Sequence, residues 1–156
     1  MDRLWAPWRM EFISKGEEKK CFLCNASADT KNDKEHLVVK RGKLVFAIMN
    51  RFPYNNGHLL ISPNRHVGLL EELTQEELLE IMNLSVEMKK KLDNAFKPDG
   101  YNMGINLGRV AGAGLPGHFH LHIVPRWNGD TNFMPVLGET KVMPEYLQKT
   151  YEKIVK

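Results

Sequence analysis

The chain is poor in cysteine, contains no long apolar run and carries no strong excess of one charge. Its two cysteines among 156 residues exclude a scaffold held by several disulfides. No apolar run approaches the roughly 18–20 residues of a membrane-spanning helix. The first ten residues, MDRLWAPWRM, lack the apolar stretch of a secretory signal. We therefore expect a cytoplasmic protein with no membrane partner.

The charge of the chain is only mildly basic. Lysine and arginine together number 22 and aspartate and glutamate 19, which gives a formal charge of +3. This small, scattered excess suits an anionic small substrate, and it is too weak to predict a nucleic-acid partner.

The length and composition predict one globular domain over residues 1–156. Hydrophobic residues make up 42% and charged residues 26%, as in proteins with a buried core. We expect a core over residues 20–127, an N-terminal arm over 1–19 and a C-terminal extension over 128–156.

Short apolar segments predict a sheet. The expected strands lie at residues 37–41, 44–50, 58–63, 101–107 and 118–124. The polar, turn-rich segment 25–36 predicts a loop, and residues 144–155 predict a short terminal helix. This pattern indicates an α+β fold with an antiparallel sheet.

One long amphipathic segment predicts the main helix. Thr74 and Glu77 form a capping box at its start, and Lys97 begins a turn that ends it. Its expected buried stripe consists of Leu78, Ile81, Met82, Met88, Leu92 and Phe96, with Ser85 as a polar gap.

The segment HFHLHIVP, residues 118–125, is the most informative part of the sequence. Alternate side chains of a strand share a face, so His118, His120 and His122 would lie on one face. Buried imidazoles need hydrogen-bond partners, which makes three of them costly as core filler. The outer two would lie about 13 Å apart, too far for all three to bind one metal ion. The histidines therefore have different tasks, with a purely structural role as the alternative.

This segment resembles the signature of the histidine-triad (HIT) superfamily, in which three histidines alternate with apolar residues. The segments 57–63 (GHLLISP), 46–50 (FAIMN) and 106–108 (NLG) resemble further family motifs in the expected order. The resemblance implies a HIT-like α+β fold with a five-stranded antiparallel sheet, one long helix, a short C-terminal helix and a homodimer. The segments 4–9 (LWAPWR) and 125–134 (PRWNGDTNFM) resemble the subgroup that acts on diadenosine tetraphosphate.

The resemblance also implies catalytic roles. His120 would attack the α-phosphorus and form a covalent nucleotidyl adduct, which water or another acceptor then resolves. A neutral imidazole near its ordinary pKa is a competent nucleophile at pH 7. His122 would donate to phosphate oxygens or to the leaving group, and His58 matches a further active-site histidine. The implied nucleotide-binding residues are Phe46, Asn50, Asn106, Gly112 and Gly114.

The glycine-rich loop at residues 108–117 leads directly into the triad. Its small residues would let backbone amides approach phosphate oxygens, although a plain turn remains an alternative. Residues 112–117 match GxGxxG, but a strand follows them and not a helix, which excludes a dinucleotide-binding fold. Many hydrolases of the family have Gln-Ser where this chain has Gly114-Leu115. This difference leaves both water and inorganic phosphate open as acceptors.

The two cysteines are expected to bind zinc. By resemblance, zinc-containing members use two cysteines three apart, a later histidine and the first triad histidine, which correspond to Cys21, Cys24, His66 and His118. Four protein ligands leave no open coordination position, so the zinc would be structural. Reduced thiols with surface histidines are the alternative. A redox role is disfavoured, because no helix start is evident at Cys21.

The sequence thus favours an enzyme that cleaves a dinucleoside polyphosphate through a nucleotidyl-His120 intermediate. Three alternatives remain: a nucleoside phosphoramidate hydrolase, a non-catalytic nucleotide-binding regulatory module, and a hydrolase with a catalytic zinc.

Overall fold

A computed structural model of the chain describes residues 21–132, 137–138 and 141–156. The expected N-terminal arm with its LWAPWR segment lies outside the described residues, as do residues 133–134 of the C-terminal motif. In the part of the chain that is described, no helix has the length and apolar character to cross a membrane.

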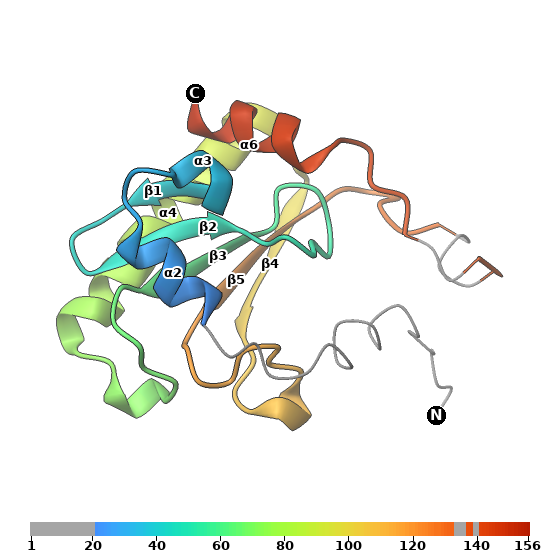
Figure 1. The fold of residues 1–156 in the computed structure, drawn as a ribbon. Helices are drawn as coiled ribbons and strands as arrows, with labels where there is room; N and C mark the ends of the chain where they lie inside the picture. Colours follow the sequence, from blue (N-terminus) through green and yellow to red (C-terminus); the bar gives the residue numbers. More distant parts are fainter. Residues whose placement is uncertain (1–20, 133–136, 139–140) are drawn as a thin grey trace.

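The core is a five-stranded antiparallel sheet (Figure 1). Its order is β1-β2-β3-β5-β4, formed by β1 (Val38–Arg41), β2 (Val45–Met49), β3 (Leu59–Pro63), β4 (Gly100–Ile105) and β5 (Leu121–Arg126). Every residue of β2 and β3 is buried, as their continuous apolar runs predict. The structure confirms the expected fold class.

The last strand begins later than predicted. The backbone N–H of Phe119 donates to the carbonyl of Val67, 2.6 Å away, so the residues before Leu121 do not pair with β3. His118 and His120 therefore lie in the segment before β5, and only His122 lies within the strand, opposite Leu60.

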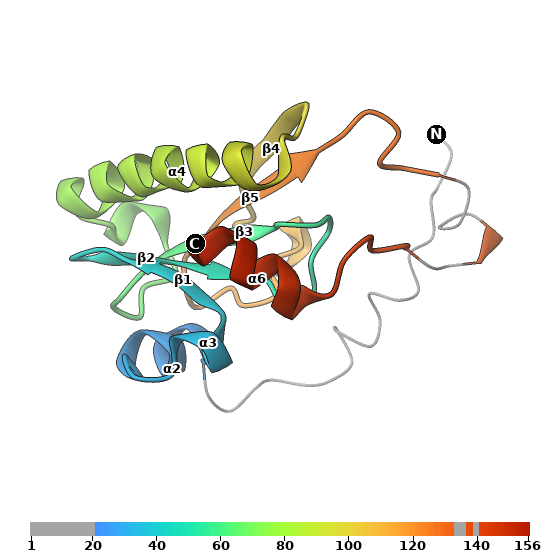
Figure 2. The same cartoon turned by 90° about the horizontal axis from the view of Figure 1, so that it is seen from above.

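Helices cover both faces of the sheet (Figure 2). The main helix α4 (Gln75–Phe96) packs on one face, with α2 (Phe22–Ala28) and α3 (Asp33–His36) on the other. The terminal helix α6 (Leu147–Val155) contacts α4 and β1. Short 3₁₀ turns lie at η1 (Leu70–Glu72) and η2 (Arg109–Ala111).

Helix α4 begins as predicted, and its buried stripe matches the prediction in part. Thr74 is the N-cap, and both hydrogen bonds of the capping box with Glu77 are present. The buried apolar positions are Ile81, Leu84, Met88 and Leu92. Leu78 and Met82 are 40% and 54% exposed, which corrects the predicted stripe. The predicted polar gap, Ser85, is fully buried, and its hydroxyl donates to the Ile81 carbonyl at 2.7 Å.

The segment predicted as a loop over residues 25–36 contains part of α2 and all of α3, so that prediction was wrong. The N-cap of α2 is Cys21, whose sulfur accepts from the backbone N–H of Cys24. A cysteine cap gives no ordinary helix-start signal in the sequence. Leu23 and Ala26 pack against apolar residues of β1, β2 and β3.

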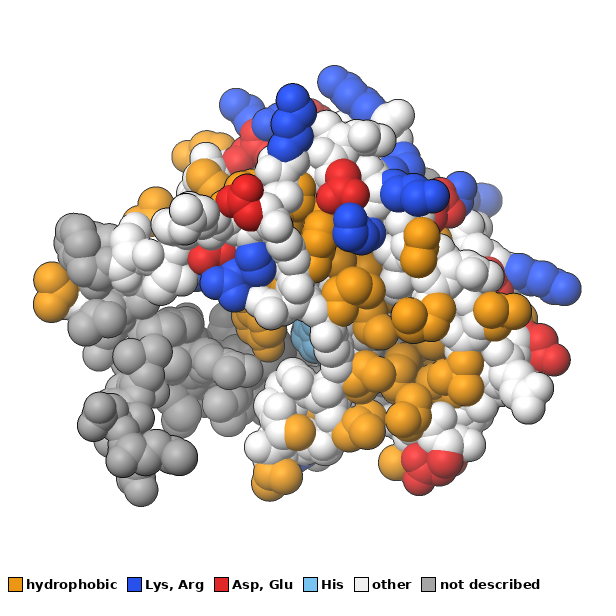
Figure 3. Space-filling model, turned by 180° about the vertical axis from the view of Figure 1, so that it is seen from behind, with side chains coloured by type: hydrophobic (Ala, Val, Ile, Leu, Met, Phe, Trp, Pro, Cys, Tyr) orange, Lys and Arg blue, Asp and Glu red, His pale blue; other side chains and the backbone are white. Residues whose placement is uncertain are grey.

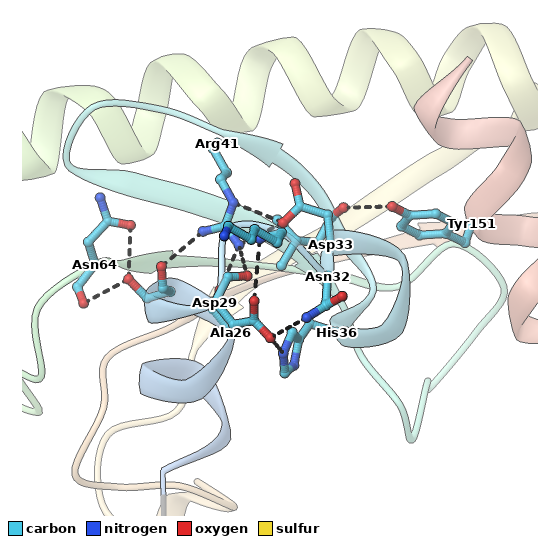
Figure 4. A network of polar contacts seen from close by, with 11 residues as sticks. Ala26, Asp29, Asn32, Asp33, His36, Arg41, Asn64 and Tyr151 are labelled. Carbon is cyan, nitrogen blue, oxygen red and sulfur yellow. Dashed lines mark hydrogen bonds and ion pairs between the residues drawn. The ribbon is translucent and has the colours of Figure 1, made fainter.

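The guanidinium of Arg41 fixes this helical segment to β1 (Figure 4). It donates to the carbonyls of Ala26, Ser27 and Asp29 at 2.7–3.1 Å and to the carboxylate of Asp33 at 2.7 Å. Hydrogen bonds to a charged group contribute about 1.5–3 kcal/mol each. Arg41 thereby satisfies the free carbonyls at the end of α2 and fixes the helix next to Cys21 and Cys24.

One face of the molecule remains apolar and exposed (Figure 3). Helix α4 packs mainly over β2, β3 and β5. The exposed apolar residues of α4 and of the β4 segment are Leu78, Leu79, Met82, Val86, Met103, Ile105 and Leu107. We call this set the α4–β4 face.

Candidate functional site

Four buried histidines lie at neighbouring positions of the β3 and β5 segments. His58 directly precedes β3, after Gly57, whose φ of 73° favours glycine. The four side chains are at most 9% exposed: His58, His118, His120 and His122. The ring centroids of His58 and His120 lie 5.1 and 5.0 Å from that of His122. The ring of His118 lies against His66 instead, at 5.1 Å. The triad histidines therefore have different neighbours, as the sequence predicts.

The proton of His120 is positioned by a main-chain carbonyl. Its Nδ1 lies 2.8 Å from the carbonyl oxygen of His118, and a carbonyl can only accept. Nδ1 therefore carries the proton, and Nε2 of the neutral ring keeps its lone pair. Burial lowers the pKa of His120, and the hydrogen bond to His118 opposes part of that shift. Nε2 is thus the nucleophilic atom of the ring.

The protons of His58 and His122 follow from one backbone amide. The N–H of Tyr54 donates to Nδ1 of His58 at 3.0 Å, so the neutral His58 ring is protonated at Nε2. This Nε2–H donates to Nδ1 of His122, 2.9 Å away. His122 is therefore protonated at its own Nε2. Among the described residues this buried nitrogen has no hydrogen-bond partner. It is a donor available to a ligand.

Burial keeps this pair of rings neutral. It is the largest cause that lowers the pKa of His58 to about 3, and nearby His122, His120 and Lys141 lower it further. Burial and then His120 lower the pKa of His122 to about 4. Neither ring carries a charge at pH 7.

A second cluster brings the four predicted metal ligands together. One donor atom from each of Cys21, Cys24, His66 and His118 lies within 4.8 Å of the others. Nε2 of His118 donates to the Pro63 carbonyl at 2.9 Å, which leaves Nδ1 facing the Cys21 sulfur at 3.2 Å. Two sulfurs and two imidazole nitrogens are donors that fit tetrahedral Zn²⁺. The cluster could therefore hold a metal ion.

Helix α2 does begin after Cys21, so the expected absence of a helix start there was wrong. Burial, with Cys21 as a further cause, raises the pKa of the Cys24 thiol to about 11. Each sulfur lies 3.2 Å from an imidazole nitrogen, Cys21 from that of His118 and Cys24 from that of His66. This arrangement of four donor atoms is typical of a metal site and disfavours a redox role.

The predicted nucleotide-binding residues have different environments. Asn50 lies beside His58, with 3.4 Å between its Nδ2 and the His58 Nδ1. Phe46 is completely buried in the cluster beneath α2, and its ring forms part of the core. Asn106 follows β4 and is half-buried.

The glycine-rich loop uses several of its own amides. The N–H groups of Ala111, Gly112 and Ala113 donate to carbonyls within the loop, as in a plain turn. Gly112 has a φ of 90°, which favours glycine, and Gly114 is exposed. These three amides are therefore engaged within the loop and are not the ones that would bind a phosphate.

Sequence reasoning missed two groups near the triad. Tyr54 acts through its main chain, which leaves no signal in residue type, and its ring also stacks on His122 with 5.8 Å between centroids. Lys141 lies far along the chain but lines a cavity together with Tyr54 and Arg126. Arg126 belongs to the PRWNGD segment, but a single arginine is usually solvated, so the sequence did not predict a role for it.

Comparisons with known proteins identify similar chains. The model of the HIT domain family matches residues 31–129. AP-4-A phosphorylase of Mycobacterium tuberculosis H37Rv is 41% identical, over 96% of this chain and 80% of the relative. The asymmetrical bis(5'-nucleosyl)-tetraphosphatase of Schizosaccharomyces pombe is 36% identical, over 60% of this chain and 50% of the relative.

Solved structures share the fold. The histidine triad nucleotide-binding protein ST2152 of Sulfolobus tokodaii has a TM-score of 0.66 and 26% identity, over 86% of this chain and 87% of that one. A Zn-bound histidine triad family protein of Mycobacterium smegmatis has a TM-score of 0.69 and 20% identity, over 87% and 91% of the two chains.

The low pKa values of His58 and His122 predict a pH dependence. The unfolded chain binds these protons near pH 6.5, and the folded protein only near 3 and 4. Below pH 6.5 the unfolded chain takes up protons that the folded protein does not bind. The free energy of unfolding is therefore highest above pH 6.5 and decreases as the pH falls towards 4. In NMR titrations, the ring signals of both residues should stay constant from pH 8 to 5. A midpoint near 6.5 for either ring would contradict the assignment.

Proposed function

Because the chain belongs to the HIT family, we propose that it cleaves dinucleoside polyphosphates such as diadenosine tetraphosphate through a covalent adduct on His120. Relatives named as a phosphorylase and a tetraphosphatase support an enzyme of this family. The observation that carries the proposal is the pairing of a nucleophilic Nε2 on His120 with a donor Nε2–H on His122.

The first step forms a bond between Nε2 of His120 and the α-phosphorus and breaks the bond from that phosphorus to the bridging oxygen. The polyphosphate leaves as an anion. Because this leaving group is stable as an anion, it needs a hydrogen bond but no proton transfer. The Nε2–H of His122 supplies that hydrogen bond. The His120 ring becomes positively charged, and its Nδ1–H stays bonded to the His118 carbonyl.

The second step releases the nucleotide. Water or inorganic phosphate attacks the phosphorus, the nitrogen–phosphorus bond breaks, and its electron pair returns to Nε2 of His120. The positive charge on the ring makes it a good leaving group. The relative named AP-4-A phosphorylase and the absence of Gln-Ser at Gly114-Leu115 support phosphate as the acceptor.

The protonation state of His122 favours polyphosphates over nucleoside phosphoramidates, the second candidate class of substrate. An amine leaving group must be protonated before it departs. Burial lowers the pKa of His122 to about 4, so at pH 7 the ring is neutral and has no imidazolium proton to give. A polyphosphate avoids this requirement.

The cluster of Cys21, Cys24, His66 and His118 holds a structural zinc ion in this proposal. The donor set supports Zn²⁺, and four protein ligands leave no coordination position for substrate. Bound zinc would keep the thiols deprotonated and tie α2 to the segment before β5. The chemistry then depends on the histidines alone.

The chain forms a homodimer through the α4–β4 face in this proposal. The support is the exposed apolar surface shared by the helix and the edge strand, since large contiguous patches of this kind mark interfaces. Met82→Glu should give monomers in light scattering, whereas Lys149→Glu, on α6, should leave the dimer intact. A native protein that is monomeric at micromolar concentration would overturn this assembly.

Product analysis with diadenosine tetraphosphate tests the activity. ADP with ATP, formed only when phosphate is present, would identify a phosphorylase, and AMP with ATP a hydrolase. His120→Ala should reduce turnover by on the order of 10³ or more, because it removes the nucleophile. His36→Ala, a substitution in α3, serves as the control. Turnover that persists in His120→Ala, or a native protein without turnover, would contradict the proposal and favour a binding module.

Cys21→Ser tests the metal site. The variant should lose bound zinc and melt about 5–10 °C lower, because one of the four proposed ligands is replaced. Asn25→Ser, a neighbouring exposed change on α2, should retain both properties. Stoichiometric zinc in Cys21→Ser would show that the assignment is wrong. Chelation that stops turnover without lowering the melting temperature would indicate a catalytic zinc.

A further inference from the structure

A cavity of about 230 Å³ opens beside the histidine site. It is lined by Tyr54, Asn55, Asn102, Val124, Arg126 and Lys141. Because the Tyr54 ring stacks on His122, the cavity adjoins the donor histidine.

The strand places the cavity in line with the catalytic groups. His122, Val124 and Arg126 occupy alternate positions of β5, so they share one face at steps of about 7 Å. His120 precedes this row on the other side of His122. Asn102 pairs with Val124, and its Oδ1 accepts from Nη1 of Arg126 at 2.7 Å, so the guanidinium reaches back toward His122. The cavity therefore extends from His122 away from the nucleophile.

The charged groups of the cavity carry a net positive charge. Arg126 forms a bidentate pair with Asp130, with nitrogen–oxygen distances of 2.6 and 2.8 Å. Lys141 donates to the carbonyl of Tyr54, and among the described residues it has no carboxylate within ion-pair distance. One arginine and one lysine against one aspartate leave a charge of +1. This charge reaches the catalytic rings, because Lys141 is one of the groups that lower the pKa of His58.

A purely structural role explains only part of this arrangement. Asp130 accepts from the Asn55 amide and from the Trp127 backbone, so the Arg126–Asp130 pair fixes the turn after β5. Lys141 adds nothing to that turn. Lys141 is exposed, its ammonium group donates to the Tyr54 carbonyl, and partial desolvation lowers its pKa, a cost that a bound anion would offset.

We propose that this cavity binds the distal phosphates of the polyphosphate chain, with Lys141 as the residue that selects for chain length. The inference rests on the proposed function, in which the leaving portion departs from the α-phosphorus on the His122 side. On binding, the ammonium of Lys141 shifts from the Tyr54 carbonyl to a phosphate oxygen. Asp130 holds the guanidinium of Arg126 in place, and its Nη1 donates to the phosphates. Phosphate oxygens would meet the cations of Lys141 and Arg126 and the side-chain amides of Asn55 and Asn102, whereas the aromatic ring of the lining, Tyr54, already stacks on His122.

Two substrates that share the same α-phosphorus but differ in their leaving groups distinguish binding of the distal phosphates from the chemical step. Diadenosine tetraphosphate extends into the cavity, whereas adenosine 5′-phosphosulfate has a leaving group too short to reach it. Lys141→Met should lower kcat/KM for the tetraphosphate about ten- to a hundredfold relative to the phosphosulfate, mainly through KM. Lys141→Arg should restore most of the preference, and Lys149→Met should match the native protein. Inorganic triphosphate should inhibit Lys141→Met more weakly by a similar factor.

The other outcomes have separate meanings. An equal loss on both substrates would show that Lys141 acts through the histidines, which overturns the inference. No loss on either substrate would overturn it as well, while leaving the proposed function intact. A native protein that cleaves the phosphosulfate and not the tetraphosphate would contradict the proposed function itself, and the subsite with it.

Discussion

Three main-chain groups decide which nitrogen of each buried histidine carries its proton, and the chemistry of the site depends on them. The His118 carbonyl fixes His120, the Tyr54 amide fixes His58 and through it His122, and the Pro63 carbonyl fixes His118. Backbone groups cannot change their role as donor or acceptor. Because burial also keeps the rings neutral, one nucleophilic nitrogen and one donor nitrogen are ready before a substrate arrives.

His118 connects the cluster of Cys21, Cys24, His66 and His118 to this arrangement. Its Nδ1 faces the cysteines, while its carbonyl accepts from the ring of His120. The cluster joins the start of α2, the segment after β3 and the segment before β5. Arg41 fixes α2 from the opposite end. A metal ion here would act on catalysis by holding the backbone of His118 in place.

The sequence predicted the elements whose signals are local. The capping box of Thr74 and Glu77 predicted the start of α4, and the apolar runs predicted β2 and β3. The HIT resemblance grouped the four candidate metal ligands, and the structure places their donor atoms within 4.8 Å of one another. It failed where tertiary contacts decide: α2 has a cysteine cap and depends on Arg41, and the β5 start is delayed by pairing with Val67. Tyr54 and Lys141 also escaped prediction, because one acts through its backbone and the other is distant in sequence.

The backbone presets the protons of the histidine site before any substrate binds. Long-range ¹⁵N–¹H NMR of the histidine rings at pH 7 tests this directly, since it reports which nitrogen of each ring is protonated. We expect a proton on Nδ1 of His120 and on Nε2 of both His58 and His122. A proton on Nε2 of His120, or a charged ring at His122, would contradict it.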